Sequence, residues 1–361
     1  MEPVQEIYRL DKTLESPAHI ASLAFGHAGH LFAGSDDGSF RVYDLSSYKV
    51  IKAVRALGAE VSSIVCVKKP GSELRDAWIA HGQKVSRFQM ESPKMIQTLE
   101  DALVTVEVGE TGDDILNELA LNANKSHLAF TMDSGVVGVI DLSDNSITKM
   151  ETKHENISAT VKFVPDRPRE LVSGGYDTVL LHFDWAQAKV LSRRQMEPYV
   201  VDGSMALAPP FIMSMAMSST GVLAAGTADG HLWIGFGGEK GSASKKKAKK
   251  WEGLDENKAL LIKVAEGPIV AVAFSDPRKL AISTLMGVIT NYQINYDEEA
   301  GSVVLQQLWQ HESTGVEKVN ALLADDKRII IGGIGKKGRG IIEIWKQEVP
   351  ATSEAALQAS S

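Results

Sequence analysis

The chain has 361 residues, 44% of them hydrophobic, and a formal net charge of −8 at pH 7. This negative charge argues against nucleic-acid binding by the whole surface, and the single Cys66 excludes a disulfide framework and a cysteine-ligated zinc site. The first residues are polar and acidic, and no stretch approaches the roughly 20 apolar residues of a membrane helix, so we expect a protein of the cytoplasm or nucleus with no membrane segment.

Short runs rich in Val, Ile and Leu follow one another along the chain, which is the pattern of β-strands. Seven units are predicted, and their first strands cover residues 20–25, 61–67, 116–121, 157–163, 212–217, 269–274 and 319–323. A fourth strand completes six of these units, near residues 50–54, 103–108, 147–150, 190–193, 260–264 and 303–309. The last unit lacks one, and the spare strand at residues 7–14 can supply it and close the ring, which removes exposed sheet edges.

The same turn recurs between the second and third strands of these units. It is a cluster of Gly, Ser, Thr and Asp, and it is clearest in residues 32–44, 129–141, 171–184 and 223–234. A similarity that repeats every few tens of residues indicates a repeat architecture, in which each unit buries its apolar face against its neighbours.

These units resemble the repeats of WD-repeat proteins. The fullest copy runs from His154 to Asp184, where Phe183-Asp184 stands in the place of the family's Trp-Asp. The resemblance implies an all-β fold, a seven-bladed WD-repeat β-propeller closed by the N-terminal strand. It covers nearly the whole chain, and residues 117–122, 154–177 and 317–320 resemble one member of the family more closely. We expect a single propeller over residues 1–348 and a disordered tail over residues 349–361.

In the family, a buried hydrogen-bond network pins each blade. The resemblance implies that His154, Ser173 and Asp177 keep such a network here, while Asp37, Asp133 and Asp229 match the turn aspartate of other units. A general-base pair of His154 and Asp177 is the alternative, but a structural network explains them better because buried polar groups need partners. We find no catalytic constellation, cofactor site or metal site, and we predict that the chain is not an enzyme.

Two segments depart from the strand pattern. Residues 237–253 form a predicted mobile basic loop, which is either a solvated linker or a nuclear import or nucleic-acid contact, and its lysines are Lys245, Lys246, Lys247, Lys249 and Lys250. The connection into the third unit is acidic. Its residues Glu110, Asp113 and Asp114 are candidates for binding a basic partner, with Tyr176 as the other candidate if this connection is only solvated.

The resulting functional hypothesis is a non-catalytic, monomeric protein-interaction scaffold. The resemblance implies, as one possible job, a substrate receptor that joins the adaptor of a cullin-RING ubiquitin ligase. The other job is a chaperone or assembly factor for a basic client such as a ribosomal protein or histone. Receptors of that ligase often carry Trp-Asp-x-Arg, and the matching stretches at residues 43–46, 140–143 and 183–186 lack the arginine. Nucleic-acid association through the basic loop is a further alternative that we do not favour.

Overall fold

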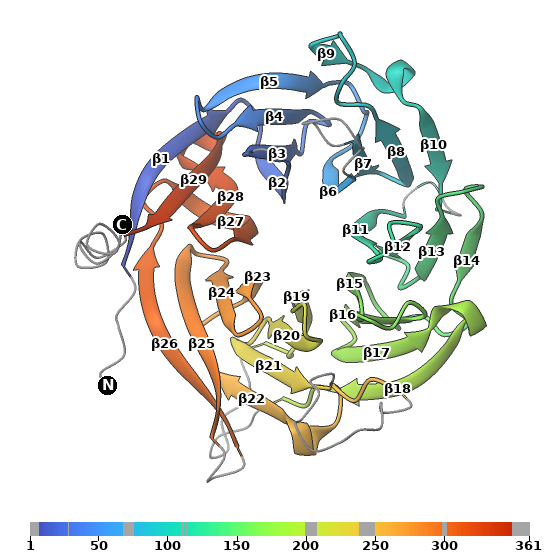
Figure 1. Cartoon of the computed structure of the whole chain (residues 1–361), viewed down its shortest axis with the longest axis vertical. Helices are drawn as coiled ribbons and strands as arrows, with labels where there is room; N and C mark the ends of the chain where they lie inside the picture. The colour runs from blue at the N-terminus through green and yellow to red at the C-terminus, as the bar shows by residue number, and fades with distance from the viewer. Residues whose placement is uncertain are drawn as a thin grey trace, which may run out of the picture.

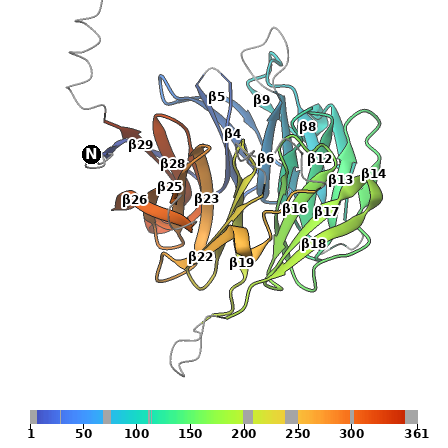
Figure 2. The ribbon, with the colours of Figure 1, turned by 60° about the horizontal axis from the view of Figure 1, so that its bottom comes forward.

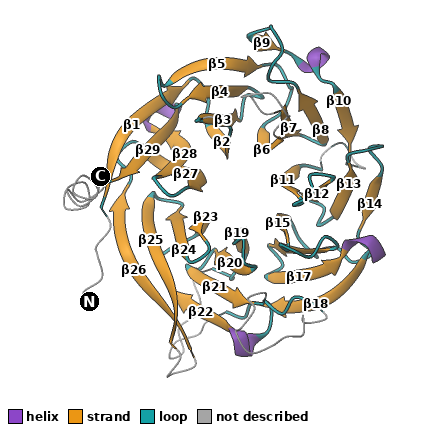
Figure 3. Ribbon diagram, in the orientation of Figure 1, coloured by secondary structure: helices purple, strands orange, loops and turns teal. Residues whose placement is uncertain are grey.

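The computed structural model describes residues 7–27, 29–67, 76–109, 112, 114–198, 208–237, 250–297 and 302–348. Across these ranges the strands form seven sheets that stand like blades around a central opening (Figure 1). No α-helix occurs within them. The helical segments drawn in Figure 3 are single 3-10 turns, η1 (Leu99–Asp101), η2 (Trp185–Gln187), η3 (Glu256–Lys258) and η4 (Lys336–Gly338). The predicted seven-bladed propeller is therefore confirmed.

Blades 3 to 6 each consist of four consecutive antiparallel strands, with the first strand innermost. In chain order these strands are β11 (Leu116–Leu121), β12 (His127–Met132), β13 (Val137–Asp141), β14 (Ile147–Lys149), β15 (Ser158–Phe163), β16 (Glu170–Gly175), β17 (Val179–Asp184), β18 (Lys189–Gln195), β19 (Ile212–Met217), β20 (Val222–Thr227), β21 (His231–Phe236), β22 (Ala259–Lys263), β23 (Ile269–Asp276), β24 (Lys279–Thr284), β25 (Val288–Asp297) and β26 (Ser302–Glu312). Their innermost strands begin at or within one residue of the predicted positions.

Blades 1, 2 and 7 contain the remaining strands. These are β1 (Tyr8–Ser16), β2 (Ile20–Phe25), β3 (His30–Ser35), β4 (Phe40–Asp44), β5 (Lys49–Val54), β6 (Val61–Val67), β7 (Asp76–His81), β8 (Lys84–Phe88), β9 (Ile96–Gln97), β10 (Val104–Glu107), β27 (Val316–Ala324), β28 (Arg328–Gly335) and β29 (Gly340–Gln347). The short β9, which the sequence pattern does not predict, leaves blade 2 between β8 and β10 and pairs in parallel with β5 of blade 1.

The N-terminal strand closes the ring. β1 pairs antiparallel with β29 and becomes the outer strand of the last blade, so the sheet order there is β1-β29-β28-β27. The side chain of Tyr8 is buried and its ring lies 5.1 Å from that of Trp309 in blade 6. Arg339 and Glu15 add an ion pair of 2.6 Å across the closing strands.

Burial explains the composition of the strands. β20 is buried along its whole length, because it lies inside its own sheet and is covered on both faces by the neighbouring blades. β22 is the outer strand of the same blade, and it alternates between partly buried and exposed residues. Continuous apolar runs in the middle of a blade and alternation at its edge are the expected result.

Neighbouring blades approach most closely at glycines in the second strand of a blade. A Cβ added to Gly226 would lie 2.5 Å from the Cγ2 of Ile269, the first residue of β23 in the next blade. The same relation joins Gly34 to Val61, Gly174 to Ile212 and Gly332 to Ile20. The recurring glycine of the turn motif thus leaves room for the first apolar side chain of the next blade.

Side chains of the innermost strands also bond to the backbone of the next blade. In each case the acceptor is the carbonyl of the first residue of that blade's innermost strand. The bonds are Ser22 Oγ to Val61 (2.6 Å), Ser62 Oγ to Leu116 (2.5 Å), Asn117 Nδ2 to Ser158 (3.1 Å), Ser214 Oγ to Ile269 (2.9 Å) and Asn320 Nδ2 to Ile20 (2.8 Å). The last of these crosses the closing junction between blades 7 and 1.

The two faces of the ring are built from different connections (Figure 2). We call the upper face the one formed by the loops that enter the innermost strands and by the turns between second and third strands. The lower face carries the turns between first and second strands and the connections from third to fourth strands. The basic loop and the β9 insertion both belong to connections of the lower face.

Deleting residues 1–14 should cost several kcal/mol of folding free energy, because the outer edge of β29 loses its partner and the packing of Tyr8 and Leu14 is lost with it. Thermal unfolding of the truncated protein measures this. A control that lacks only residues 1–6 keeps β1 and should melt like the full chain. Equal melting temperatures for all three proteins would contradict closure by β1.

Replacing Gly226 by alanine should destabilise the protein by about 1–3 kcal/mol, the usual range for overpacking, since the new Cβ would press on Ile269. Gly267→Ala is the matched control. A Cβ at Gly267 has no atom within 4 Å, so its stability should change by less than about 0.5 kcal/mol. Urea unfolding of both variants measures these changes in stability. Similar unfolding midpoints would contradict the close contact between Gly226 and Ile269.

Candidate functional site

His154, Ser173 and Asp177 come together in blade 4. His154 lies in the loop before β15, Ser173 lies in β16 and Asp177 follows in the next turn. The imidazole is 1% exposed, and its Nδ1 lies 2.9 Å from Oδ1 of Asp177 while Nε2 lies 2.8 Å from the Ser173 hydroxyl. Because a carboxylate only accepts hydrogen bonds, Nδ1–H donates to Asp177, while Nε2 shares its hydrogen bond with the Ser173 hydroxyl.

The environment of Asp177 favours its charged form. Burial alone would raise the pKa of this carboxyl group, but the hydrogen bond and charge of His154 outweigh burial and lower it, helped by the backbone N–H groups of Glu155 and Val179. The three side chains satisfy one another between a loop and a turn. We propose that the group is structural.

The turn aspartates of blades 1 and 5 do not reach a loop histidine. Asp37 accepts from the backbone N–H of Ser39 (2.9 Å) within its own turn. Asp229 lies 2.9 Å from Nδ1 of His231, which belongs to β21 of the same blade. Both side chains therefore order their own turns, with partners that differ from those in blade 4.

The structure corrects the register of the turn in blade 3. The backbone N–H of Asp133 donates to the carbonyl before β11, as that of Tyr176 does to the carbonyl before β15. Asp133 therefore corresponds to Tyr176, and Ser134 stands where blade 4 has Asp177. The Ser134 backbone N–H and hydroxyl donate to Asp114, at 2.9 and 2.8 Å.

Asp114 is consequently not the surface charge that the sequence predicts. It is 7% exposed and both of its oxygens accept from Ser134. A carboxylate in the loop and a hydroxyl in the turn thus replace the loop histidine and turn aspartate of blade 4. The other acidic candidates, Glu110 and Asp113, lie outside the described residues.

Two further buried networks that anchor an upper loop were not predicted from the sequence. In blade 2, burial lowers the pKa of His81, whose Nδ1 lies 3.1 Å from the Leu57 carbonyl and whose Nε2 lies 2.8 Å from the Ser86 hydroxyl. In blade 7, Glu343 is fully buried and accepts from the hydroxyl of Thr314 at 2.7 Å and from the N–H of Gly315 at 2.5 Å. Glu343 lies in the third strand, where the turn motif gives no signal.

The upper rim of the central opening has two chemically different sides. In each of blades 1–6 we define it by two residues: the residue before the innermost strand, and the first residue of the turn between the second and third strands. On blades 1–3 it includes three acidic residues, Asp36, Glu60 and Asp133. From the end of blade 3 to blade 6 it is apolar, with Ile115, Ile157, Tyr176, Phe211, Ala228, Pro268 and Leu285.

Tyr176 lies on the apolar side of this rim. Its ring stacks on that of Phe211 with centroids 5.5 Å apart and an interplanar angle of 20°. Burial raises the pKa of its hydroxyl group, and the charge of Asp133 raises it further. The predicted partner-binding candidate therefore sits where the apolar and acidic sides meet.

The predicted basic loop is only partly described. Lys245, Lys246, Lys247 and Lys249 lie outside the described residues, and Lys250 is exposed, with its Nζ donating to the Leu191 carbonyl at 3.2 Å. The end of the predicted loop is not mobile surface. Trp251 is completely buried and its indole N–H donates to the Gly221 carbonyl at 2.9 Å.

Glu170 of β16 holds this buried segment. It accepts from the backbone N–H of Trp251 at 2.9 Å and from Arg167 at 3.0 Å, and it lies 3.0 Å from Nε2 of His182. Burial alone would raise the pKa of Glu170, but these partners lower it to about 2. The apolar side chain beside the lysine run is the signal in the sequence that this end of the segment is anchored.

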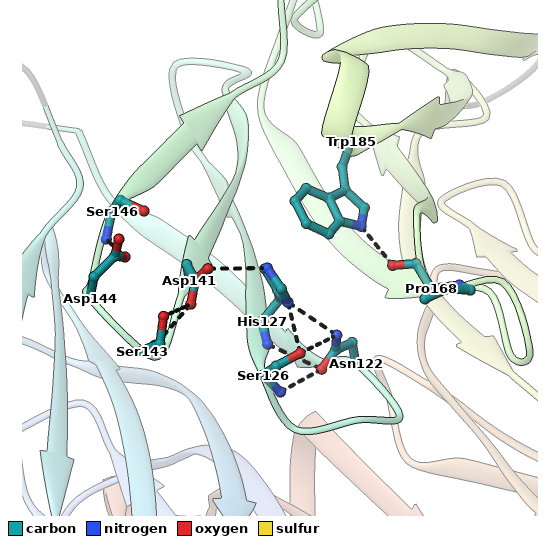
Figure 4. Close-up of polar contacts among 9 residues, drawn as sticks. All are labelled: Asn122, Ser126, His127, Asp141, Ser143, Asp144, Ser146, Pro168 and Trp185. Atoms are coloured by element: carbon teal, nitrogen blue, oxygen red, sulfur yellow. Dashed lines mark hydrogen bonds and ion pairs between the residues drawn. The ribbon is translucent and has the colours of Figure 1, made fainter.

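The lower face of blades 3 and 4 carries a compact polar cluster, shown in Figure 4. The Trp185 ring lies 4.5 Å from that of His127 and its indole donates to the Pro168 carbonyl at 2.9 Å. Two cavities of about 240 and 450 Å³ lie nearby and share Phe163 in their linings. Asp184, at the Trp-Asp position, pairs with Arg169 at 2.9 Å.

Among the described residues, no group of three or more His, Cys, Asp or Glu side chains could hold a metal ion. The helical segments in the same part of the chain are too short and too polar to cross a membrane. The exposed groups of the upper rim suit contact with another macromolecule.

Comparison with known proteins agrees with the fold. A family model described as WD domain, G-beta repeat, matches residues 9–44, which cover β1 to β4. The chain is 24% identical over 204 residues to a WD repeat-containing protein 53 homolog of Dictyostelium discoideum, an alignment that covers 52% of this chain and 53% of the relative. The chain thus matches about half the length of that relative.

A solved structure confirms the architecture. The β-propeller domain of Cps50 (Swd1) from Myceliophteria thermophila superposes with a TM-score of 0.68 at 15% identity, covering 94% of this chain and 99% of that one. The resemblance to WD-repeat proteins, and within them to WD repeat-containing protein 53, is therefore confirmed by independent comparisons.

Replacing Asp177 by alanine should cost about 1–3 kcal/mol, because buried His154 loses its acceptor. The lowered pKa of Asp177 adds a pH dependence: its stabilisation is complete above the ordinary value of 3.8 and disappears as the pH falls through the lower folded-state pKa. Urea unfolding at pH 7 and near pH 3 measures both effects.

Asp326→Ala is the control for this experiment, since the side chain of Asp326 is exposed. If Asp177→Ala unfolds like wild type at pH 7 but abolishes binding to a partner, the group is functional and the structural assignment fails.

Proposed function

We propose that this chain is a non-catalytic protein-interaction scaffold that binds a protein partner on its upper face. WD-repeat propellers generally act in this way, although a fold alone does not establish a function. The observation that carries the proposal is the upper rim, where an acidic side and an apolar side lie on one rigid ring.

The rim has the composition of a recognition surface. Ile115 of blade 3 is 47% exposed, and the stacked pair of Tyr176 and Phe211 continues the apolar side on blades 4 and 5. Aromatic and aliphatic side chains of this kind supply the central contacts of protein interfaces, and surrounding charges select the partner. The loops and turns that hold Ile115 and Tyr176 are anchored by the buried networks of blades 3 and 4, so little order has to be gained there on binding.

A basic client fits this surface better than nucleic acid. The acidic residues of the rim would repel a phosphate backbone and attract lysine or arginine. The ligase-receptor role finds less support, because Asp184 is already paired with Arg169 from a different turn and the predicted motif lacks its arginine. We therefore favour an assembly or adaptor role for a basic protein.

Two exposed isoleucines allow a matched test. Ile115 lies on the upper rim and Ile96, 52% exposed, lies in β9 at the outer edge of blade 1. Ile115→Arg should reduce recovery of the partner several-fold in quantitative affinity purification, because it blocks the rim with bulk and charge, whereas Ile96→Arg should leave recovery unchanged.

The identity of the recovered proteins separates the roles. Ribosomal proteins or histones would support the basic-client role, and cullin adaptor subunits would support the ligase role. Equal loss or equal retention of partners in both variants, with wild-type melting temperatures, would remove the upper face from the binding site.

A further inference from the structure

Two of the three carboxylates on the acidic side of the upper rim, those of Glu60 and Asp133, have no basic partner among the described residues. Glu60 makes no hydrogen bond or ion pair with the described residues, and Asp133 accepts only from the neutral amide of Asn117, at 3.0 Å. Asp36 is held by His19 at 2.8 Å. Although much of the Glu60 side chain is exposed, partial burial and the nearby charge of Asp36 raise its pKa. Positive charge is what this side lacks.

The apolar side of the rim begins next to the acidic side, where Ile115 is 47% exposed. Ile115 precedes β11 directly and adjoins the acidic side, since Asp133 donates its backbone N–H to the Ile115 carbonyl. Tyr176 and Phe211 continue the apolar side, and the Tyr176 hydroxyl makes no hydrogen bond within the described chain. One backbone hydrogen bond therefore holds Asp133, which has a carboxylate, next to Ile115, which has an exposed aliphatic side chain.

The ring geometry decides what can use both sides together. These residues lie at the upper ends of the first and second strands of their blades, and the first strands surround the opening in Figure 1. A segment laid along the rim over blade 3 would meet the carboxylate of Asp133 and the exposed side chain of Ile115 together. Blade 7 contributes exposed Lys336 and Lys337 to the same face, so the acidic side ends there.

We propose that the upper rim binds an extended protein segment in which a lysine or arginine stands within two residues of an aliphatic or aromatic side chain. The cationic group contacts Glu60 and Asp133, and the apolar side chain covers Ile115 and the edge of the Tyr176–Phe211 pair. This deepens the proposed function and rests on it: the partner is recognised by a short mixed motif, and not by positive charge alone.

An unbiased selection tests the motif. A display library of random dodecapeptides is selected on the wild-type protein, and the enriched peptides are sequenced. The proposal expects enrichment of Lys or Arg next to Leu, Ile, Phe, Tyr or Trp. Enrichment of purely apolar or acidic peptides, or no enrichment, would overturn it.

Matched variants then locate the binding. For an enriched peptide labelled with fluorescein, anisotropy should give about tenfold weaker binding to Glu60→Gln/Asp133→Asn, the usual scale for losing close charge pairs. The control Asp166→Asn/Asp326→Asn removes the same charge from exposed residues of the lower face and should bind like wild type. The difference between the two pairs should shrink in 0.5 M salt, because exposed charges are screened.

A second pair tests the apolar contact. Ile115→Ser should weaken the same peptide severalfold, whereas Ile96→Ser, which removes an equally exposed isoleucine elsewhere, should not. Melting temperatures confirm that all variants are folded. If the cellular partner is lost in Ile115→Arg while peptide affinity ignores Glu60, Asp133 and Ile115, the scaffold function stands and the motif is wrong. If that variant keeps its partner as well, both fail.

Discussion

The close contact of neighbouring blades at a glycine is the constraint on which the rest of the molecule depends. Seven sheets can surround one opening only if their inner ends come very near to each other, and at Gly226 there is no space even for a methyl group beside Ile269. Protein interiors are packed too densely to absorb such an atom without a shift. Since every blade packs against two others, a shift at one contact between blades would be passed on around the ring.

The polar anchors of the blades show that this rigid ring tolerates several chemical solutions to one problem. Each upper loop buries backbone groups that need partners. Blade 4 uses His154 with Asp177, blade 3 uses Asp114 with Ser134, and blade 7 uses Glu343. What these groups share is a hydrogen-bond acceptor or donor at a fixed place between loop and turn. Because these anchoring groups are buried, the exposed residues of the rim can differ from blade to blade. One side of the rim can therefore be acidic and the other apolar.

Sequence patterns predicted the parts of the structure that arise from local repetition. The innermost strands follow from the repeated strand pattern, the closing strand β1 from the missing fourth strand of the last unit, and the contact of His154 with Ser173 and Asp177 from the family resemblance. The two sides of the rim were not predicted, because their residues come from six blades and gather on one face only in the folded ring. Asp114 shows the limit within a single segment: a run of acidic residues looks like surface, and only the fold reveals that one of them is buried under Ser134.

Tertiary contacts also decided the elements that escaped prediction. β9 has only two residues and exists because β5 offers it a partner edge. Trp251 follows a lysine run, which suggests solvent, but Glu170 and the core of blade 5 bury it. Both depend on residues far away in the sequence, and neither leaves a periodic signal in its own segment.

The pairing of β1 with β29 has a mechanical consequence. The register places Tyr8 opposite Gln347, and Ser16 opposite Gly340, so both chain segments leave the blade at the same end of an antiparallel pair. A pull applied to these two ends would load the hydrogen bonds one pair at a time, from Tyr8 and Gln347 inward, and not all in parallel. The junction that completes the ring would therefore peel open under a small force. Tension on the two ends would open this blade before any other.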